Sequence, residues 1–412
     1  MIHAALILFI ALASILCMLV RPRGISEAYG ISAGALLLVA LGLLPLRQAA
    51  NAVREGLDVY LFLIGMMILA ELAREEGVFD WVADIAAAHA KGSPSRLFLL
   101  IYLAGTVITA LLSNDATAVV LTPAVLAVVR KAKLQAKPFV LGCALIANAA
   151  SFVLPISNPA NLVIFAKNMP PLTNWLRTFF APSLASILIT FLVLRFLSKS
   201  HLSDRIEDLD GRSRLSSQGR VALIGLVFAC LILITASILG VSLGGPTCAA
   251  SVIALLLVAG RDPAVIRTIT RSISWSIVPL VAGLFVIVEA VEGAGWLRFA
   301  QSGLEALARA PHVLGNLGAA FGSGLLSNAM NNLPVGLMGA KALQTGQSRS
   351  LLNAVLMGVD LGPNLSVTGS LATILWLIAL RRDKVEITAW QFLKVGMLAM
   401  PLALIGSVLL LR

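Results

Sequence analysis

Charged residues are scarce in this chain. Only 12% of its 412 residues are Asp, Glu, Lys or Arg, whereas 59% are hydrophobic, and the mean hydropathy is +0.95. Soluble domains carry about 25% charged residues, so a soluble globular protein is excluded, because so few polar residues could not cover a core of this size. Long apolar runs separated by short polar loops indicate instead an all-α polytopic membrane protein.

Residues that usually carry chemistry are scarce as well. The four cysteines form no CxxC pair and no disulfide framework. The four histidines lie near span ends or in linkers, and the chain contains neither a His-Glu-x-x-His run nor a Walker A motif. We therefore expect no metal site, no cofactor and no enzymatic activity.

The net charge of +11 does not point to a nucleic-acid partner. The basic residues sit in short loops between apolar runs, not in a patch interleaved with aromatic residues. If hairpin-like segments return to the side they came from, most Lys and Arg fall on one side, in loops 21–24, 91–96, 130–137, 199–220, 261–271 and 381–394. The positive-inside rule then predicts a bacterial inner-membrane protein with a cytoplasmic central linker and two periplasmic termini.

Apolar segments of membrane-spanning length form two groups of five, separated by the polar linker 199–220. We expect one structural repeat in residues 1–198 and a second in 221–412. The spans of the first repeat are 2–20, 25–44, 57–74, a broken span across 138–166, and 177–198. Those of the second are 221–240, 245–260, 273–291, a broken span across 351–380, and 388–411.

Each group contains two further features in the same order. An amphipathic stretch (77–92 or 296–309) precedes a hairpin-like pair of apolar arms (97–112 with 116–129, or 313–326 with 333–343). The letters Leu-Leu-Ser-Asn recur at both hairpin tips, in 111–114 and 325–328. Because five spans is an odd number, the second half must enter the membrane inverted. The sequence thus predicts two inverted repeats, each with five spans, a re-entrant helical hairpin and a broken helix.

Polar residues interrupt the apolar runs at the two hairpin tips and the two broken spans. Interrupted helices at matching positions of two halves are typical of a transport site. Asp115 lies at the first tip and Asp360 in the second broken span, although an ionised Asp at a helix centre costs about 2.5–3.5 kcal/mol. Each carboxylate could cap a helix N-terminus, or it could carry a proton in a transport cycle.

Asparagine and hydroxyl side chains at these interruptions both donate and accept hydrogen bonds, and so suit an uncharged, hydroxylated solute. Alternatively, these side chains hydrogen-bond between neighbouring helices and hold the helices together. The candidates for solute binding are Asn114, Thr117, Asn158, Asn161, Asn328, Asn331, Asn332 and Ser370. The residues expected to support the helix breaks are Asn148, Ser157, Gly362, Pro363, Asn364 and Gly369.

The two tips and the second break also carry a family resemblance. The stretches Ser113 to Pro123, Leu325 to Pro334 and Asp360 to Trp376 resemble the arsenite efflux permeases of the ArsB type, within the ion transporter superfamily. This resemblance implies secondary export of arsenite or antimonite from the cytoplasm in exchange for protons. In related dicarboxylate carriers the tips read Ser-Asn-Thr and bind sodium. Here Asp115 and Ala329 take the third position, so the resemblance favours protons, carried by Asp115 and Asp360.

Other functions remain open at this point. Related exporters of silicic acid imply that silicic acid, or a sodium-coupled carboxylate, is an alternative solute, and a passive channel is a further alternative. ATP-driven transport would need a separate cytoplasmic arsenite-stimulated ATPase subunit. A thiolate site for arsenic is not expected, because no second cysteine is near Cys143 in the sequence. An intramembrane aspartyl protease is a further alternative, but such enzymes carry a Gly-x-Gly-Asp run. The run here is Gly358-Val359-Asp360, so a protease is not expected.

Overall fold

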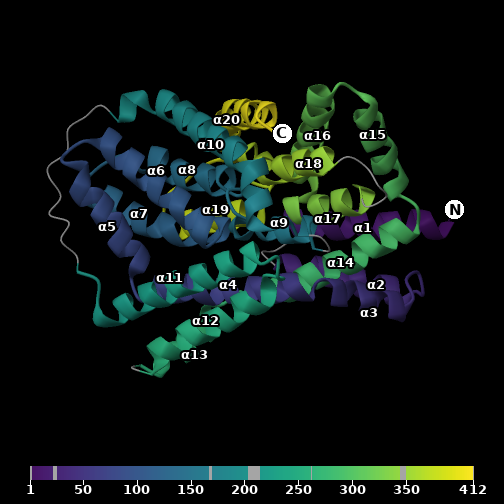
Figure 1. Ribbon diagram of the computed structural model, residues 1–412, viewed down its shortest axis with the longest axis horizontal. Helices are drawn as coiled ribbons and strands as arrows, with labels where there is room; N and C mark the ends of the chain where they lie inside the picture. The colour runs from purple at the N-terminus through teal and green to yellow at the C-terminus, as the bar shows by residue number, and fades with distance from the viewer. Residues whose placement is uncertain are drawn as a thin grey trace.

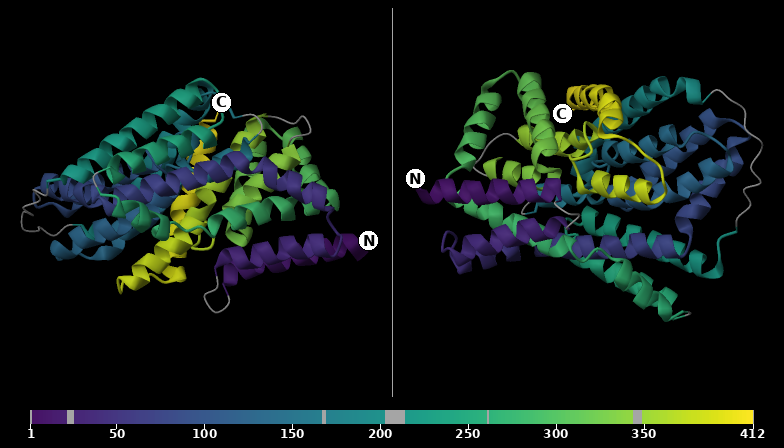
Figure 2. Two further views of the ribbon diagram at one scale, coloured as in Figure 1. Left: turned by 90° about the horizontal axis from the view of Figure 1, so that it is seen from below. Right: turned by 180° about the vertical axis from the view of Figure 1, so that it is seen from behind.

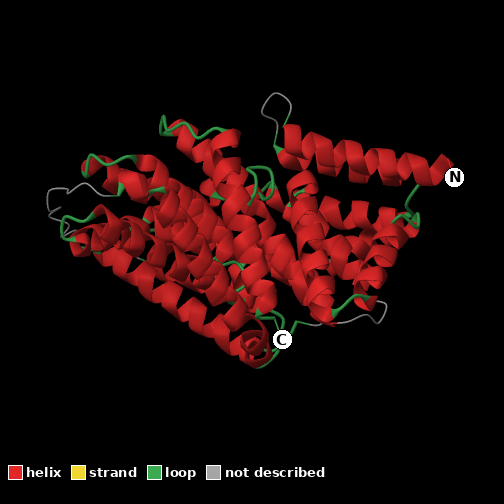
Figure 3. Ribbon diagram, turned by 90° about the horizontal axis from the view of Figure 1, so that it is seen from above, coloured by secondary structure: helices red, strands yellow, loops and turns green. Residues whose placement is uncertain are grey.

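The computed structural model describes residues 2–21, 26–166, 169–202, 214–260, 262–343 and 349–411. Within these ranges all regular structure is helical (Figure 3), so the all-α prediction is confirmed. Residues 203–213, half of the predicted linker, lie outside the described residues. The helices before this gap are α1 (Ile2–Val20), α2 (Glu27–Ala40), α3 (Leu46–Glu55), α4 (Leu57–Glu75), α5 (Val78–Ala90), α6 (Pro94–Leu111), η2 (Ala116–Leu121), α7 (Thr122–Lys131), α8 (Ala136–Ala149), η3 (Pro155–Ser157), α9 (Pro159–Ile164), α10 (Leu172–Leu197) and η4 (Lys199–His201).

The helices after the linker repeat the order of the elements from α1 to α10 (Figure 1). They are α11 (Ser217–Ile238), α12 (Gly244–Ala259), α13 (Ala264–Ser272), α14 (Ile277–Gly293), α15 (Leu297–Arg309), α16 (His312–Met330), α17 (Asn332–Leu343), α18 (Arg349–Leu361), η5 (Gly362–Asn364), α19 (Leu371–Arg382) and α20 (Ala389–Leu409). In Figure 1, α1 begins at one end of the long axis and α11 near the other, and both views of Figure 2 place α1 at the edge of the bundle.

Six of the described helices are long and apolar enough to cross a membrane, or seven if the bent pair α3–α4 is one span. The apolar helices α2, α8 and α12 are shorter, and the ten-span count stays a prediction. One feature of the sequence interpretation was wrong. It treats 45–56 and 261–271 as loops, but these segments hold the helices α3 and α13. Both are strongly amphipathic, so a search for long apolar runs misses them.

The two groups of helices pack against each other reciprocally. Helix α2 lies against α14, and α4 lies against α12. In both helix pairs a glycine allows the two backbones to approach closely. A Cβ atom added to Gly65 of α4 would lie 2.8 Å from Thr247, and one added to Gly283 of α14 would lie 2.8 Å from Ile31. This exchange of partners supports a twofold relation between the halves, whose opposite orientation in the membrane stays a prediction.

Polar contacts between distant segments join only segments that the sequence assigns to the same side of the membrane. On the side of the linker, Ser95 donates to the Leu202 carbonyl (2.9 Å), Arg74 to Ser272 (3.4 Å), and Arg130 contacts Asp383. On the side of the termini, the Gly244 amide donates to Asp58 (2.8 Å) and Trp296 to the Ala4 carbonyl (2.8 Å). We call these two groups of segments the linker side and the terminal side.

Candidate functional site

Four helical segments begin at the four polar interruptions, and each beginning is capped by a side chain. Such a cap satisfies one of the backbone N–H groups that a helix leaves free in its first turn. The caps are Ser113 Oγ on the Ala116 amide (3.2 Å), Asn158 Oδ1 on Ala160 (3.0 Å), Asn331 Oδ1 on Leu333 (3.3 Å) and Ser370 Oγ on Thr373 (3.2 Å). Asn331 adopts a φ of 75° with a ψ of 154°, a backbone conformation that residues other than glycine rarely adopt.

All four interruptions contribute to one central cavity. Its volume is about 20 Å³, room for roughly one water molecule. Positive ends of helix dipoles therefore converge on a small enclosed space. The lining residues are Leu63, Asn114, Asp115, Asn158, Pro159, Ile277, Asn332, Leu333, Ser370, Leu371 and Ala372.

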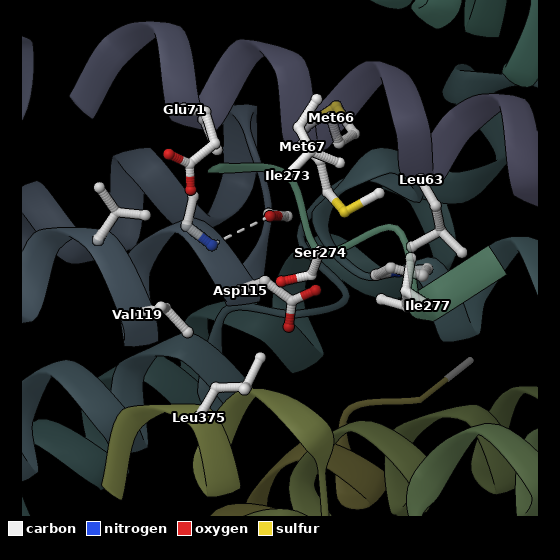
Figure 4. A pocket seen from close by; sticks show the side chains of 15 residues that line it. Leu63, Met66, Met67, Glu71, Asp115, Val119, Ile273, Ser274, Ile277 and Leu375 are labelled. Atoms are coloured by element: carbon white, nitrogen blue, oxygen red, sulfur yellow. Dashed lines mark hydrogen bonds between the residues drawn. The ribbon is translucent and has the colours of Figure 1, made fainter. Parts of the chain in front are cut away.

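A larger cavity of about 90 Å³ adjoins the central cavity and shares Leu63, Asp115, Pro159 and Ile277 with it. We call it the vestibule. It extends to Glu71 near the linker-side end of α4, and Figure 4 shows Glu71 and Asp115 among its labelled lining residues, with Ser274 beside Asp115. The other lining residues are Met66, Met67, Ala70, Ser113, Ala116, Val119, Val120, Ile273 and Leu375.

The two acids predicted to carry protons have different surroundings. Asp115 is half-buried and lines both cavities. Asp360 is fully buried in α18, where its Oδ1 accepts a hydrogen bond from Asn158 Nδ2 (2.8 Å). Its Oδ2 has no hydrogen-bond partner among the described residues. Asn158 therefore connects the start of α9, at the central cavity, to the acid behind it.

The predicted solute ligands separate into two groups by what their side chains contact. Asn114, Asn158, Asn332 and Ser370 line the central cavity. In Asn114, which is 2% exposed, the Oδ1 atom has no partner within the described chain. The amide group of Asn332 makes no hydrogen bond to another described residue, while its backbone N–H donates to the Gly369 carbonyl (3.0 Å) and ties the second tip to the second break.

Three other predicted ligands do not line the cavity, and their side chains hydrogen-bond to groups of the protein itself. Thr117 Oγ1 accepts a hydrogen bond from Thr109 Oγ1 (2.8 Å) and donates one to the Gly105 carbonyl (3.3 Å). Asn161 donates to the Ser151 carbonyl (2.8 Å). Asn328 donates to the Gly324 and Gly362 carbonyls (2.7 and 2.9 Å) and accepts from Ser366 (2.6 Å). Since interrupted helices leave carbonyls unpaired inside a membrane, such side chains are needed to satisfy them. Asn331 likewise caps the second tip. A role in solute binding stays a prediction for all eight residues.

The residues predicted to support the breaks lie in the joints between the two broken spans and their neighbours. Asn148 donates to Asn364 (3.0 Å), which donates in turn to the Leu145 carbonyl (3.1 Å). Ser157 donates to the Ala110 carbonyl (3.0 Å) in the first hairpin.

At the second break, backbones approach too closely for a side chain. A Cβ atom on Gly362 would lie 2.5 Å from the Gly324 carbonyl oxygen, and one on Gly369 would lie 2.5 Å from Pro363. These two glycines therefore allow the second tip and the second break to pack in contact with each other.

The sequence interpretation missed the vestibule and one ion cluster. It gave no role to Glu71, Glu289 or Glu292, three acids near the ends of predicted spans. In the structure Glu71 lines the vestibule, and Lys341 of α17, with 9% of its side chain exposed, donates to Glu289 (2.5 Å) and Glu292 of α14. A signal was present: Glu71 precedes Gly77 by the same number of residues as Glu289 precedes Gly295, and both glycines have positive φ before an amphipathic helix.

Comparison with known proteins agrees with this architecture. The chain is 27% identical over 390 residues to an arsenical pump membrane protein of Escherichia coli, with 91% of each chain covered. It is 26% identical over 392 residues to an arsenical pump membrane protein of Yersinia enterocolitica, covering 92% and 91%. The solved structure of the Alcanivorax borkumensis YdaH transporter, described as having an unusual topology, matches 88% of this chain and 86% of its own with a TM-score of 0.56 and 16% identity.

A family model described as "Citrate transporter" matches residues 4–380, nearly the whole chain. The predicted membership of the ion transporter superfamily is thereby confirmed. The chain is a multi-pass membrane transporter and belongs to the citrate transporter (CitMHS) family.

Proposed function

We propose that this protein exports trivalent metalloid, as arsenite or antimonite, from the cytoplasm across a bacterial inner membrane in exchange for protons. The observation that carries the proposal is the central cavity, where capped helix starts and the side chains of Asn114, Asn158, Asn332 and Ser370 surround Asp115. The relatives named arsenical pump membrane proteins, which align over most of their length, support the choice of solute.

The charge of the cavities favours a neutral solute. Neither cavity is lined by Lys, Arg or His, and two carboxylates, Asp115 and Glu71, line the vestibule. Arsenous acid is uncharged near pH 7 and presents hydroxyl groups in three directions, which amide, hydroxyl and carboxylate oxygens can bind. Citrate carries several negative charges, so binding it next to Asp115 would bring like charges together without a compensating cation.

A carboxylate provides the link between solute and proton. When Asp115 is ionised, it can accept hydrogen bonds from solute hydroxyls, and when it is protonated, it loses much of that capacity. Proton and solute then compete for one group, and by linkage each weakens the binding of the other by the same factor. Asp360, whose Oδ2 is unpartnered, is the second candidate carrier, because a proton would remove the cost of a half-satisfied buried charge.

Uptake into everted membrane vesicles tests the proposal. Vesicles containing the protein should accumulate As(III) or Sb(III) uphill when a proton gradient is imposed, and a protonophore should abolish accumulation whether or not Na⁺ is present. Exchange of a neutral solute for a proton is electrogenic, with about 2.3 kcal/mol per proton per 100 mV. A passive channel would not accumulate solute, and a sodium requirement would point to a sodium-coupled carrier.

Substitution of the two acids tests the coupling separately. We expect Asp115→Asn and Asp360→Asn to abolish accumulation driven by the proton gradient, with Asp58→Asn as a control at a carboxylate outside both cavities. If both variants accumulate metalloid as the wild type does, the assignment of these acids fails. Stimulation by a separate ATPase subunit would appear as ATP-dependent accumulation that persists after the protonophore is added.

A further inference from the structure

The two cavities differ in the size of solute that they can hold. The central cavity, at about 20 Å³, accepts roughly one water molecule. A metalloid hydroxide has four heavy atoms and does not fit there in this conformation. The vestibule, at about 90 Å³, is several times larger. Of these two cavities, the vestibule is therefore the one that can hold a solute of this size in the conformation described here.

Polar groups with unused hydrogen-bonding capacity lie at both ends of the vestibule. Where the vestibule meets the central cavity, Asp115 has no hydrogen-bond partner in the described part of the chain. At the outer end, Glu71 Oε2 accepts from Arg74 Nε (2.8 Å) and Nη2 (2.7 Å). The second oxygen of Glu71, Oε1, has no partner among the described residues.

Hydroxyl groups contribute to the same surface. Ser113, 4% exposed, accepts from the Ala116 amide through its Oγ and still has an O–H to donate. Ser274 Oγ makes no hydrogen bond within the described chain, and it lies beside Asp115 in Figure 4. Carboxylate acceptors and serine hydroxyls therefore line the same cavity, as binding of a compact polyhydroxy molecule requires.

The other half of the protein has a counterpart of Glu71, but there the acid pairs with a lysine from another helix. Glu289 holds the equivalent position in α14 before Gly295. It accepts from Lys341 of the second hairpin arm, which also reaches Glu292. The second hairpin and α14 are thus tied together on the terminal side, whereas on the linker side Glu71 pairs with Arg74 of its own helix and lines a cavity.

We propose that the vestibule is a second solute site, in which a small neutral polyhydroxy acid is held between Asp115 and Glu71, with Ser113 and Ser274 as further ligands. The solute binds here on the linker side before the hairpin tips open to admit it to the central cavity. This site rests on the function proposed above and adds to it the first binding position and the residue Glu71.

Equilibrium dialysis of arsenous acid against the purified protein tests this site without depending on transport. The loss of one charge-assisted hydrogen bond corresponds to roughly a tenfold change in affinity, so Glu71→Gln should raise the Kd about tenfold. Ser274→Ala should raise it about threefold, since the lost bond is a neutral one. Glu75→Gln is the matched control, because Glu75 lies on the same helix, contacts Arg74 at 3.7 Å and does not line the vestibule.

The outcomes separate this site from the proposed function. Weaker binding by Glu71→Gln and Ser274→Ala, with Glu75→Gln unchanged, supports the vestibule site. Binding by Glu71→Gln equal to that of the wild type overturns the vestibule site, as does equal weakening in all three variants. Neither result argues against the proposed export of metalloid. If the wild type neither binds nor transports arsenous acid, the proposed function itself fails and the site fails with it.

Discussion

The contact between Asn158 and Asp360 should make a measurable contribution to stability. Asn158 has two roles: its Oδ1 caps α9, and its Nδ2 donates the single hydrogen bond that Asp360 receives. Asn158→Ala removes both. The lost cap costs about 1 kcal/mol, and a buried acceptor left without a donor costs about 1–3 kcal/mol. We therefore expect the free energy of unfolding to fall by about 2–4 kcal/mol.

A serine variant separates the two roles. In Asn158→Ser the side chain can still cap α9, as Ser370 caps α19, but it is too short to reach Asp360. The variant should recover about 1 kcal/mol of the loss. A double-mutant cycle of Asn158→Ala with Asp360→Ala isolates the contact itself. Hydrogen bonds between membrane helices average about 0.6 and reach about 1.7 kcal/mol in such cycles, and the carboxylate acceptor should place this one near the upper value.

The measurement is unfolding of the purified protein in mixed micelles as the SDS fraction rises. Tryptophan fluorescence can report it, because the chain has six tryptophans and Trp175 and Trp376 are fully buried. A coupling energy near zero would refute the reasoning, and so would an Asn158→Ser variant no more stable than Asn158→Ala. The first result would mean that the link between α9 and α18 does not stabilise the broken spans, and the second would mean that the cap of α9 does not.

Three further predictions concern packing, charge and sidedness. Gly65→Ala should destabilise the protein by about 1–3 kcal/mol, because its Cβ would lie 2.8 Å from the Thr247 backbone. Gly303→Ala, with open space around its Cβ, should instead stabilise α15 by about 1 kcal/mol, and unfolding in SDS measures both effects. Lys341→Met should destabilise the protein by leaving two carboxylates together, and adding Glu289→Gln should restore part of the loss in the same assay. A cysteine replacing Lys133 should react with a membrane-impermeant thiol reagent in everted vesicles but not in intact cells, and the reverse result would contradict the predicted cytoplasmic linker.

Much of the fold could be predicted because the membrane imposes strict requirements on length and polarity. The ends of α1, α4 and α15 fall within a few residues of the predicted segments, since each is a run with a clear start and end. Helices α3 and α13 were missed because short amphipathic helices lack an apolar run. Their presence at matching places in both groups would have been the strongest additional sign of a repeat.

The sequence predicts which segments form the candidate site, but not which of their side chains face the cavity. The reasoning that polar interruptions converge identifies Asn114, Asn158, Asn332 and Ser370, which do line one cavity. It cannot tell these residues from Asn161 or Asn328, which bond to backbone carbonyls. That distinction depends on which carbonyls the breaks leave free, and this is a property of the three-dimensional path of the chain. Glu71 was missed for a related reason, since an acid at a span end normally contacts water.

The balance of charge around the central cavity accounts for the neutral solute in the proposed function, although the family is named for citrate. Four capped helix starts direct partial positive charge toward the cavity. Without acids nearby, that field would suit an anionic solute such as a carboxylate. In this chain Asp115 lines the cavity, and Asp360 is one hydrogen bond away through Asn158, so the protein itself supplies the negative charge. The cavity is then suited to a neutral solute. The two acids that compensate the helix starts are also groups that can take up a proton, so in the proposed function the charge that favours a neutral solute is the same charge that couples its export to proton entry.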